Sequence, residues 1–168
     1  MSVFRSKSPA SVAGFTLTEL VMVLAVVAVI SAIAVSRMGN DPLVVATQAE
    51  QLAADIRYVQ SLAMTQAAAA PGQARYRINF VSASTYTFTQ ADGTAVLHPL
   101  TGSAAATALG SGVTMAGPPL VGFDGRGIPY TDAAVSVLLG ATATITLTKD
   151  AAVRTVTVAP ETGLVRVP

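Results

Sequence analysis

The side chains that could carry chemistry are few and lie far apart in the sequence. His98 is the only histidine of the 168 residues, and no serine–histidine–aspartate constellation, HExxH motif or phosphate-binding loop occurs with it. The absence of cysteine excludes disulfides, thiolate metal sites and a cysteine nucleophile. We therefore predict a protein that is not an enzyme and needs no cofactor, with His98 structural or solvated at the end of a strand.

Asp124 and Asp132 are the carboxylates that could be considered for a metal site. They lie eight residues apart with few further oxygen ligands nearby, which does not fit the EF-hand arrangement. In the stretch FDGRG, Asp124 can instead accept backbone N–H groups as an Asx-turn. We predict this turn role for Asp124, no metal, and a solvated turn position for Arg126.

Glu19 is the only charge in the apolar stretch FTLTELVMVLAVVAVISAIAV, residues 15–35. Charged residues make up only 11% of the chain, against about 25% in a typical soluble domain, and this stretch contributes much of the apolar excess. As a helix, its 21 residues would extend about 31 Å, which matches a hydrocarbon core of about 30 Å. Because Arg5 and Lys7 precede it, the positive-inside rule places the short leader in the cytoplasm.

Three interpretations of this segment remain open from the residues alone. A secretory signal could be cleaved at Ala32–Ile33–Ala34, although its apolar region would normally span only about 7–15 residues. A plain anchor would stay uncleaved. In the third interpretation, the spacing between Gly14 and Glu19 belongs to a functional motif.

The hexapeptide Gly14-Phe15-Thr16-Leu17-Thr18-Glu19 resembles the processing site of type IV prepilins and pseudopilins. The resemblance implies a leader over residues 1–14, cleaved after Gly14 by a prepilin peptidase, and N-methylation of Phe15. The carboxylate of Glu19 would then neutralise the terminal amine of a neighbouring subunit and set the register of a filament. A local role is compatible with this one, since Thr16 and Glu19 also form a capping box and an acid suits the first turn of a helix.

Two helices are expected to position these residues. We predict a transmembrane helix over 15–38, a break near 39–41 at Gly39 and Asn40, and an amphipathic helix over 39–66. Spacings of three and four residues predict that one apolar stripe of the second helix packs on a sheet: Val45, Ala49, Leu52, Ile56, Val59 and Ala63. The polar residues expected to face water are Gln48, Gln51, Asp55, Arg57 and Gln66.

Residues 67–168 alternate between apolar and polar side chains and predict a β-rich globular domain. Asp92–Gly93 indicates a hairpin turn, and the Ala-, Gly- and Ser-rich residues 101–112 indicate a mobile loop. The expected strands are ARYRINF, TYTFTQ, TAVLHPL, VTMAG, GIPY, AVSVLLG, TATITLTK, RTVTVAP and LVRV. The predicted fold class is α+β, a type IV pilin-like fold in which a long N-terminal helix covers a single twisted antiparallel sheet.

Three further stretches resemble the GspH/FimT type of minor pseudopilins and minor pilins: ADIRYVQSLAMTQ, VGFDGRGIP and the ending TITLTKDAAVRTVTVAPETGLVRV. The first is also similar to minor pilins of mannose-sensitive-haemagglutinin-type pili. Ser36 stands where many relatives have a proline. The resemblance implies a single-pass protein of the bacterial inner membrane with a periplasmic C-terminal domain. It also implies the partners: membrane lipid, other pilins through the N-terminal helix, prepilin peptidase and an inner-membrane assembly platform. Some relatives bind calcium, which keeps that ion as an alternative at Asp124.

Binding of DNA during natural transformation is a second function that the resemblance allows. The candidate contacts are Arg126, Lys149, Arg154 and Arg166. Removal of the leader would leave eight basic against nine acidic residues, whereas non-specific binding to DNA draws on several phosphate contacts. We therefore expect structural partners rather than nucleic acid. A membrane-anchored periplasmic binding domain is the other alternative.

Overall fold

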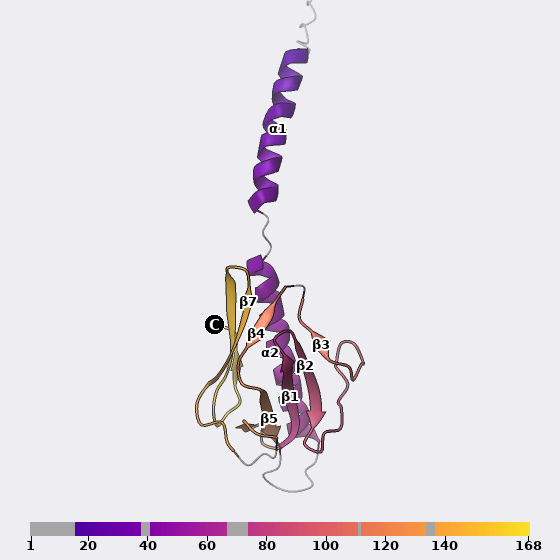
Figure 1. Cartoon of the computed structure of the whole chain (residues 1–168), viewed down its shortest axis with the longest axis vertical. Coiled ribbons are helices and arrows are strands. Elements are labelled where there is room, and N and C mark those ends of the chain that lie inside the picture. Colours follow the sequence, from indigo (N-terminus) through magenta and orange to yellow (C-terminus); the bar gives the residue numbers. More distant parts are fainter. Residues whose placement is uncertain (1–15, 38–40, 67–73, 111, 134–136) are drawn as a thin grey trace, which may run out of the picture. The chain divides into compact units, whose positions relative to one another are not determined.

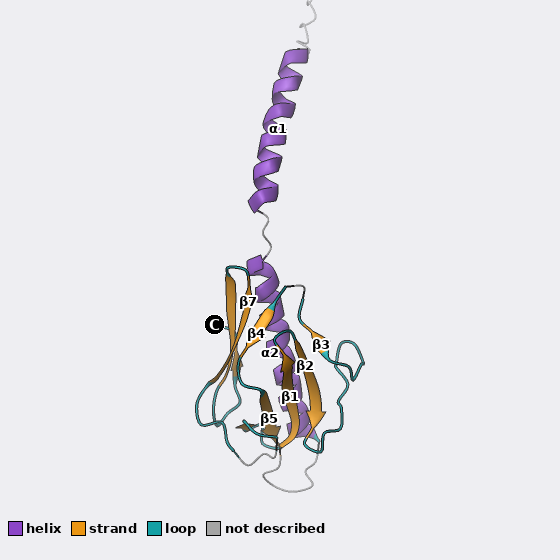
Figure 2. Cartoon of the chain, in the orientation of Figure 1, coloured by secondary structure: helices purple, strands orange, loops and turns teal. Residues whose placement is uncertain are grey.

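The computed structural model describes residues 16–37, 41–66, 74–110, 112–133 and 137–168 (Figure 1). The chain divides into two compact units, Met1–Gly39 and Asn40–Pro168. Within the described residues the first unit contains a single helix, and the second combines a helix with strands and loops (Figure 2).

Helix α1 of the first unit spans Leu17–Arg37. The hydroxyl oxygen of Thr16 accepts a hydrogen bond from the backbone N–H of Glu19 at 3.2 Å, so Thr16 caps the helix as the sequence predicts. Among the described residues, no helix combines the length and the apolarity that a membrane crossing requires. The membrane-spanning role of residues 15–38 therefore stays a prediction.

Helix α2 spans Asp41–Thr65, which begins two residues later and ends one residue earlier than the predicted range of 39–66. All six residues of the predicted apolar stripe are buried, and Ala53 and Asp55 are buried with them. The burial of Asp55 contradicts the expectation that its side chain faces water. The break expected near 39–41 falls mainly on residues 38–40, which lie outside the described residues.

The first sheet has the strand order β3-β2-β1-β5-β6, with all neighbours antiparallel. Its strands are β1 (Ala74–Ser82), β2 (Thr85–Gln90), β3 (Thr107–Ala108), β5 (Leu120–Asp124) and β6 (Pro129–Tyr130). The alternation read from the sequence is confirmed, because Tyr76, Ile78, Tyr86 and Phe88 are all buried.

The second sheet has the order β4-β7-β8-β9 and is also antiparallel. Its strands are β4 (Thr114–Ala116), β7 (Ala143–Lys149), β8 (Ala152–Val158) and β9 (Val165–Arg166). Helix α2 packs against strands of both sheets, as Figure 1 shows, and their apolar faces join in one core.

The α+β class is confirmed, but the prediction of a single sheet is wrong. Pro118 and Pro119 separate β4 from β5, and proline has no N–H group to donate to a strand ladder. The strand is thus interrupted between β4, which pairs with β7, and β5, which pairs with β1.

The loop expected over 101–112 contains the short strand β3 and the buried Leu109, so part of it belongs to the first sheet. The predicted strand TAVLHPL makes only an isolated bridge between Ala95 and Thr89. The described residues of AVSVLLG likewise contribute only a bridge from Leu138 to Tyr130. Strand β5 was not predicted, because glycine and proline on both sides of it indicate turns.

Candidate functional site

The residues expected to direct processing and assembly lie at the start of the chain. Gly14 and Phe15 are outside the described residues. Glu19 lies in the first turn of α1, and within the described part of the chain no cation forms an ion pair with its carboxylate. The hydroxyl of Thr16 accepts a hydrogen bond from the backbone N–H of Glu19. The side chain of Glu19 takes no part in this bond and can contact another molecule.

From Leu20 to Ile30 the described surface of α1 carries only apolar side chains. From Thr16 to Ala32 every side chain of the unit is exposed, with 78% of Leu17 and 74% of Met22 accessible. A helix that is apolar all round normally lies in a protein core or in lipid. An exposed surface of this kind is suited to contact with acyl chains or with other apolar helices.

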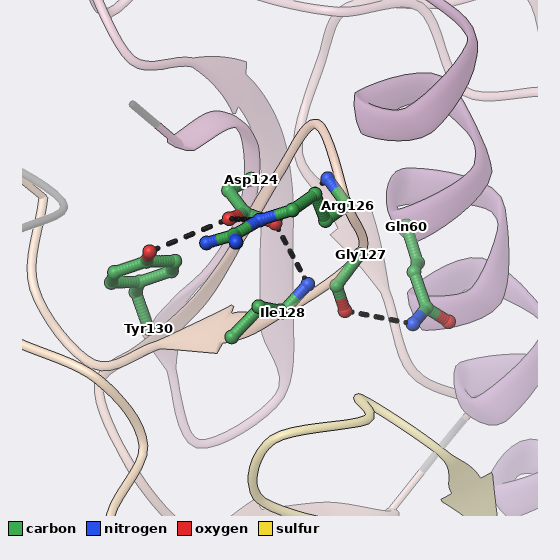
Figure 3. A network of polar contacts seen from close by, with 6 residues as sticks. All are labelled: Gln60, Asp124, Arg126, Gly127, Ile128 and Tyr130. Atoms are coloured by element: carbon green, nitrogen blue, oxygen red, sulfur yellow. Dashed lines mark hydrogen bonds and ion pairs between the residues drawn. The ribbon is translucent and has the colours of Figure 1, made fainter. Parts of the chain in front are cut away.

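The carboxylate of Asp124 organises the turn between β5 and β6 (Figure 3). One oxygen, Oδ1, accepts the backbone N–H groups of Arg126 and Ile128, both at 2.9 Å. The other oxygen, Oδ2, lies 3.3 Å from Nε of Arg126 and 3.4 Å from the hydroxyl of Tyr130. The side chain of Asp124 is buried, so the predicted turn role is confirmed.

Gln60 fastens this turn to α2. Its side-chain amide donates to the carbonyl oxygen of Gly127 at 3.0 Å (Figure 3) and to the carbonyl oxygen of Thr162 at 3.2 Å. One side chain of the helix thereby holds the β5–β6 turn of the first sheet and the β8–β9 turn of the second. The arrangement is structural, and among the described residues no group of three or more His, Asp or Glu side chains is placed to hold a metal ion.

Two of the four candidate DNA-contacting cations form ion pairs, and the other two lie on opposite faces of the second sheet. Lys149 pairs with Asp41 of α2 at 2.9 Å, and Arg126 pairs with Asp124. Arg154 lies two and four residues before the buried Val156 and Val158, so it is on the same face of β8 as these residues. Arg166 lies opposite Thr157 in the β8–β9 ladder and hence on the other face of the sheet.

A buried polar cluster that the sequence analysis missed joins α2, β2 and the segment after β2. The carboxylate oxygen Oδ2 of Asp55 accepts the hydroxyl of Tyr86 at 2.6 Å and lies 3.2 Å from Nε2 of His98. All three side chains are almost fully buried, so His98 is structural rather than solvated. The signal was available for Asp55, which follows Leu52 by three residues and precedes Val59 by four, a spacing that puts it on the apolar stripe.

The cluster has the residue types of a catalytic site but lacks a free base. Burial raises the pKa of Tyr86 far above its ordinary value, and the hydrogen bond and charge of Asp55 raise it further, so the hydroxyl stays protonated. His98 uses both ring nitrogens, because Nδ1 accepts the backbone N–H of Leu100 at 3.1 Å. The arrangement holds the segment after β2 against the core and offers no unoccupied nitrogen for proton transfer.

Comparison with known protein families, with characterised proteins and with solved structures found no match. What the described residues show is an α+β domain and, as a separate unit, a helix with an exposed, mostly apolar surface and one carboxylate, Glu19, in its first turn.

Proposed function

We propose that this protein is a minor pilin or minor pseudopilin of the GspH/FimT type, a structural subunit of a type IV pilus or a type II secretion pseudopilus. A prepilin peptidase removes residues 1–14, and the new terminus at Phe15 is N-methylated. The mature subunit is held in the inner membrane by residues 15–38, with its globular domain in the periplasm. An assembly platform then transfers it into the filament.

The observation that carries the proposal is the free carboxylate of Glu19 on an otherwise apolar, exposed helix, five residues after Gly14 in a prepilin-like hexapeptide. Each large apolar side chain hidden from water contributes about 1.5–3 kcal/mol, so such a helix requires lipid or other helices around it. Transfer from the bilayer to a bundle of like helices keeps this surface away from water throughout.

Glu19 gives the bundle its register. A carboxylate at the centre of a bilayer costs up to about 3 kcal/mol, and less near the end of a helix, so such a group is expected to have a partner. Cleavage after Gly14 creates that partner as the cationic amine of Phe15. In a filament, any stagger that separates this amine from the Glu19 of a neighbour leaves two charges unpaired in an apolar environment.

The test is the replacement Glu19→Ala, with Glu50→Ala as its matched control, because Glu50 is an exposed glutamate on α2. We expect normal cleavage and membrane insertion of both variants. Filaments purified from the Glu19→Ala strain should contain about tenfold less of the subunit, which corresponds to the loss of about 1.4 kcal/mol per subunit. Quantitative immunoblotting of filament and membrane fractions gives the ratio, and unchanged incorporation would remove the role assigned to Glu19.

A further inference from the structure

We propose that the outer edge of β3 and the groove beside it form a docking site for an extended, uncharged segment of a partner protein. The segment adds one strand to the first sheet, and its alternate side chains enter the groove. This inference does not depend on the role proposed for α1.

The outer edge of β3 presents backbone groups that no neighbouring strand uses. The N–H of Leu109 donates to the carbonyl oxygen of Ser84 at 2.8 Å, and Thr107 lies opposite Tyr86 in the same ladder. Because successive residues of a strand turn their N–H and C=O groups to opposite sides, the backbone groups of Ala108 point away from β2. Within the part of the chain that the structure describes, they form no hydrogen bond.

The other strands at the edges of the two described sheets are covered or blocked. The N–H of Met115 in β4 donates to the carbonyl oxygen of Ala83 at 2.6 Å, so the turn before β2 covers that edge. Strand β6 contains Pro129, and β9 carries the exposed charge of Arg166. Charges and prolines normally protect sheet edges, and residues 105–108 contain neither.

The groove beside β3 has a volume of about 360 Å³ and no lysine, arginine or acid in its lining. One wall is formed by residues 105–108, and the others by Gln51 of α2 and the turn around Leu100. The amide of Gln51 and the hydroxyl of Thr107 form no hydrogen bond to any described residue, so both can bind a guest. The side chain of Leu100 is 77% exposed and adds an apolar surface.

These features define the chemistry of the occupant. Open backbone donors and acceptors at a sheet edge pair with the N–H and C=O groups of an extended chain, which favours a polypeptide strand. Apolar or small polar side chains fit a groove that contains Leu100 and no charge. A carboxylate or an ammonium group would lose its water there without gaining an oppositely charged partner.

The test probes an array of short synthetic peptides with the full chain in non-ionic detergent micelles. One set contains only Ala, Val, Leu, Ser and Thr, and each peptide has a matched partner with Glu or Lys at its centre. We expect the uncharged peptides to bind about tenfold more tightly than their charged partners. In ¹⁵N spectra the amides of Ala106 and Ala108 should shift on binding, while that of Val156 in β8 stays unchanged.

Two substitutions locate the binding. Ala108→Pro removes the outward N–H, which no bond to β2 requires, and Ala108→Ser keeps this N–H as the matched control. Ala108→Pro should bind the uncharged peptides about tenfold more weakly, and Ala108→Ser within about twofold of the wild type. Gln51→Glu leaves the backbone unchanged and should shift the preference toward peptides that contain Lys.

The proposal is overturned by equal binding to the wild type and Ala108→Pro, by the absence of a preference for uncharged peptides, or by shifts confined to other amides. The absence of measurable binding by every peptide would also contradict it. If the amides of Ala106 and Ala108 shift with protein concentration in the absence of peptide, the occupant is a second copy of the chain, and the proposed partner is wrong.

Discussion

Among the described residues, Asp55 is held in the core by a tyrosine and a histidine and forms no ion pair with a lysine or arginine. Its oxygen Oδ2 meets the hydroxyl of Tyr86 and the imidazole of His98. Hydrogen bonds to a charged group contribute about 1.5–3 kcal/mol each, and the loss of one leaves part of a buried charge unsatisfied. Apolar periodicity predicts that position 55 faces inward, but it cannot predict which distant side chains meet the carboxylate there.

The first prediction concerns the alkaline stability of this cluster. Because the pKa of Tyr86 is raised in the folded chain, the unfolded chain releases the phenolic proton near pH 10 while the folded chain retains it. The contribution of Tyr86 to the free energy of unfolding is therefore fully present below about pH 10 and declines above it. Tyr86→Phe removes both the hydrogen bond and the titration. Urea denaturation should show the wild type more stable by about 1.5–3 kcal/mol at pH 8, with the difference shrinking by up to about 1.4 kcal/mol per pH unit above pH 10. A difference that stays constant from pH 8 to pH 11 would contradict this assignment.

A second prediction at this scale concerns Gly163, where the β8–β9 turn meets Gln60. Its backbone has φ of 64°, and a Cβ atom would lie 2.5 Å from Nε2 of Gln60 and 2.5 Å from the carbonyl oxygen of Gly127. Gly93 also has a positive φ, of 90°, but its Cβ would meet nothing within 4 Å. Gly163→Ala should therefore lower the free energy of unfolding by about 1–3 kcal/mol more than Gly93→Ala, because only the first variant adds a clash to the backbone strain. Equal losses in denaturant titrations would show that the Gln60 contact is not tightly packed.

Among the elements, α2 was the most predictable and the sheets were the least. The six-residue stripe from Val45 to Ala63 identifies the buried face, because the helical period is visible in the sequence itself. The division into two sheets depends on which strands pair across long separations, such as β4 with β7, and alternation within one strand carries no information about its partner. The short strand β3 lies in a stretch whose residues indicate a loop, so its place is set by its neighbour β2 rather than by its own residues.

The third prediction tests the role of α2 as the element that covers both sheets. Leu52 is fully buried, whereas Leu43 on the same helix is 69% exposed. Leu52→Ala should lower the free energy of unfolding by about 2–5 kcal/mol, and Leu43→Ala by less than about 0.5 kcal/mol. Denaturant titrations of the full chain in micelles supply both values. Comparable losses at the two positions would mean that the stripe does not carry the core.

On the scale of the whole molecule, the two units differ in what covers their apolar surface. The second unit buries its own apolar core, to which α2 and both sheets contribute. The described side chains of α1 remain exposed, so the protein as a single chain leaves a large apolar surface uncovered. The proposed filament gives each unit a role: α1 assembles, and the α+β domain faces outward. The sequence predicts the assembly residues by motif, but the structure of one chain cannot contain a partner for Glu19.

The mass of the mature protein extracted from bacterial membranes tests this account most directly. We predict a chain that starts at N-methylated Phe15, and a Gly14→Arg variant that retains its leader. A chain that begins at Val35 and is recovered in the soluble fraction, or one that keeps Met1 in the wild type, would contradict the account.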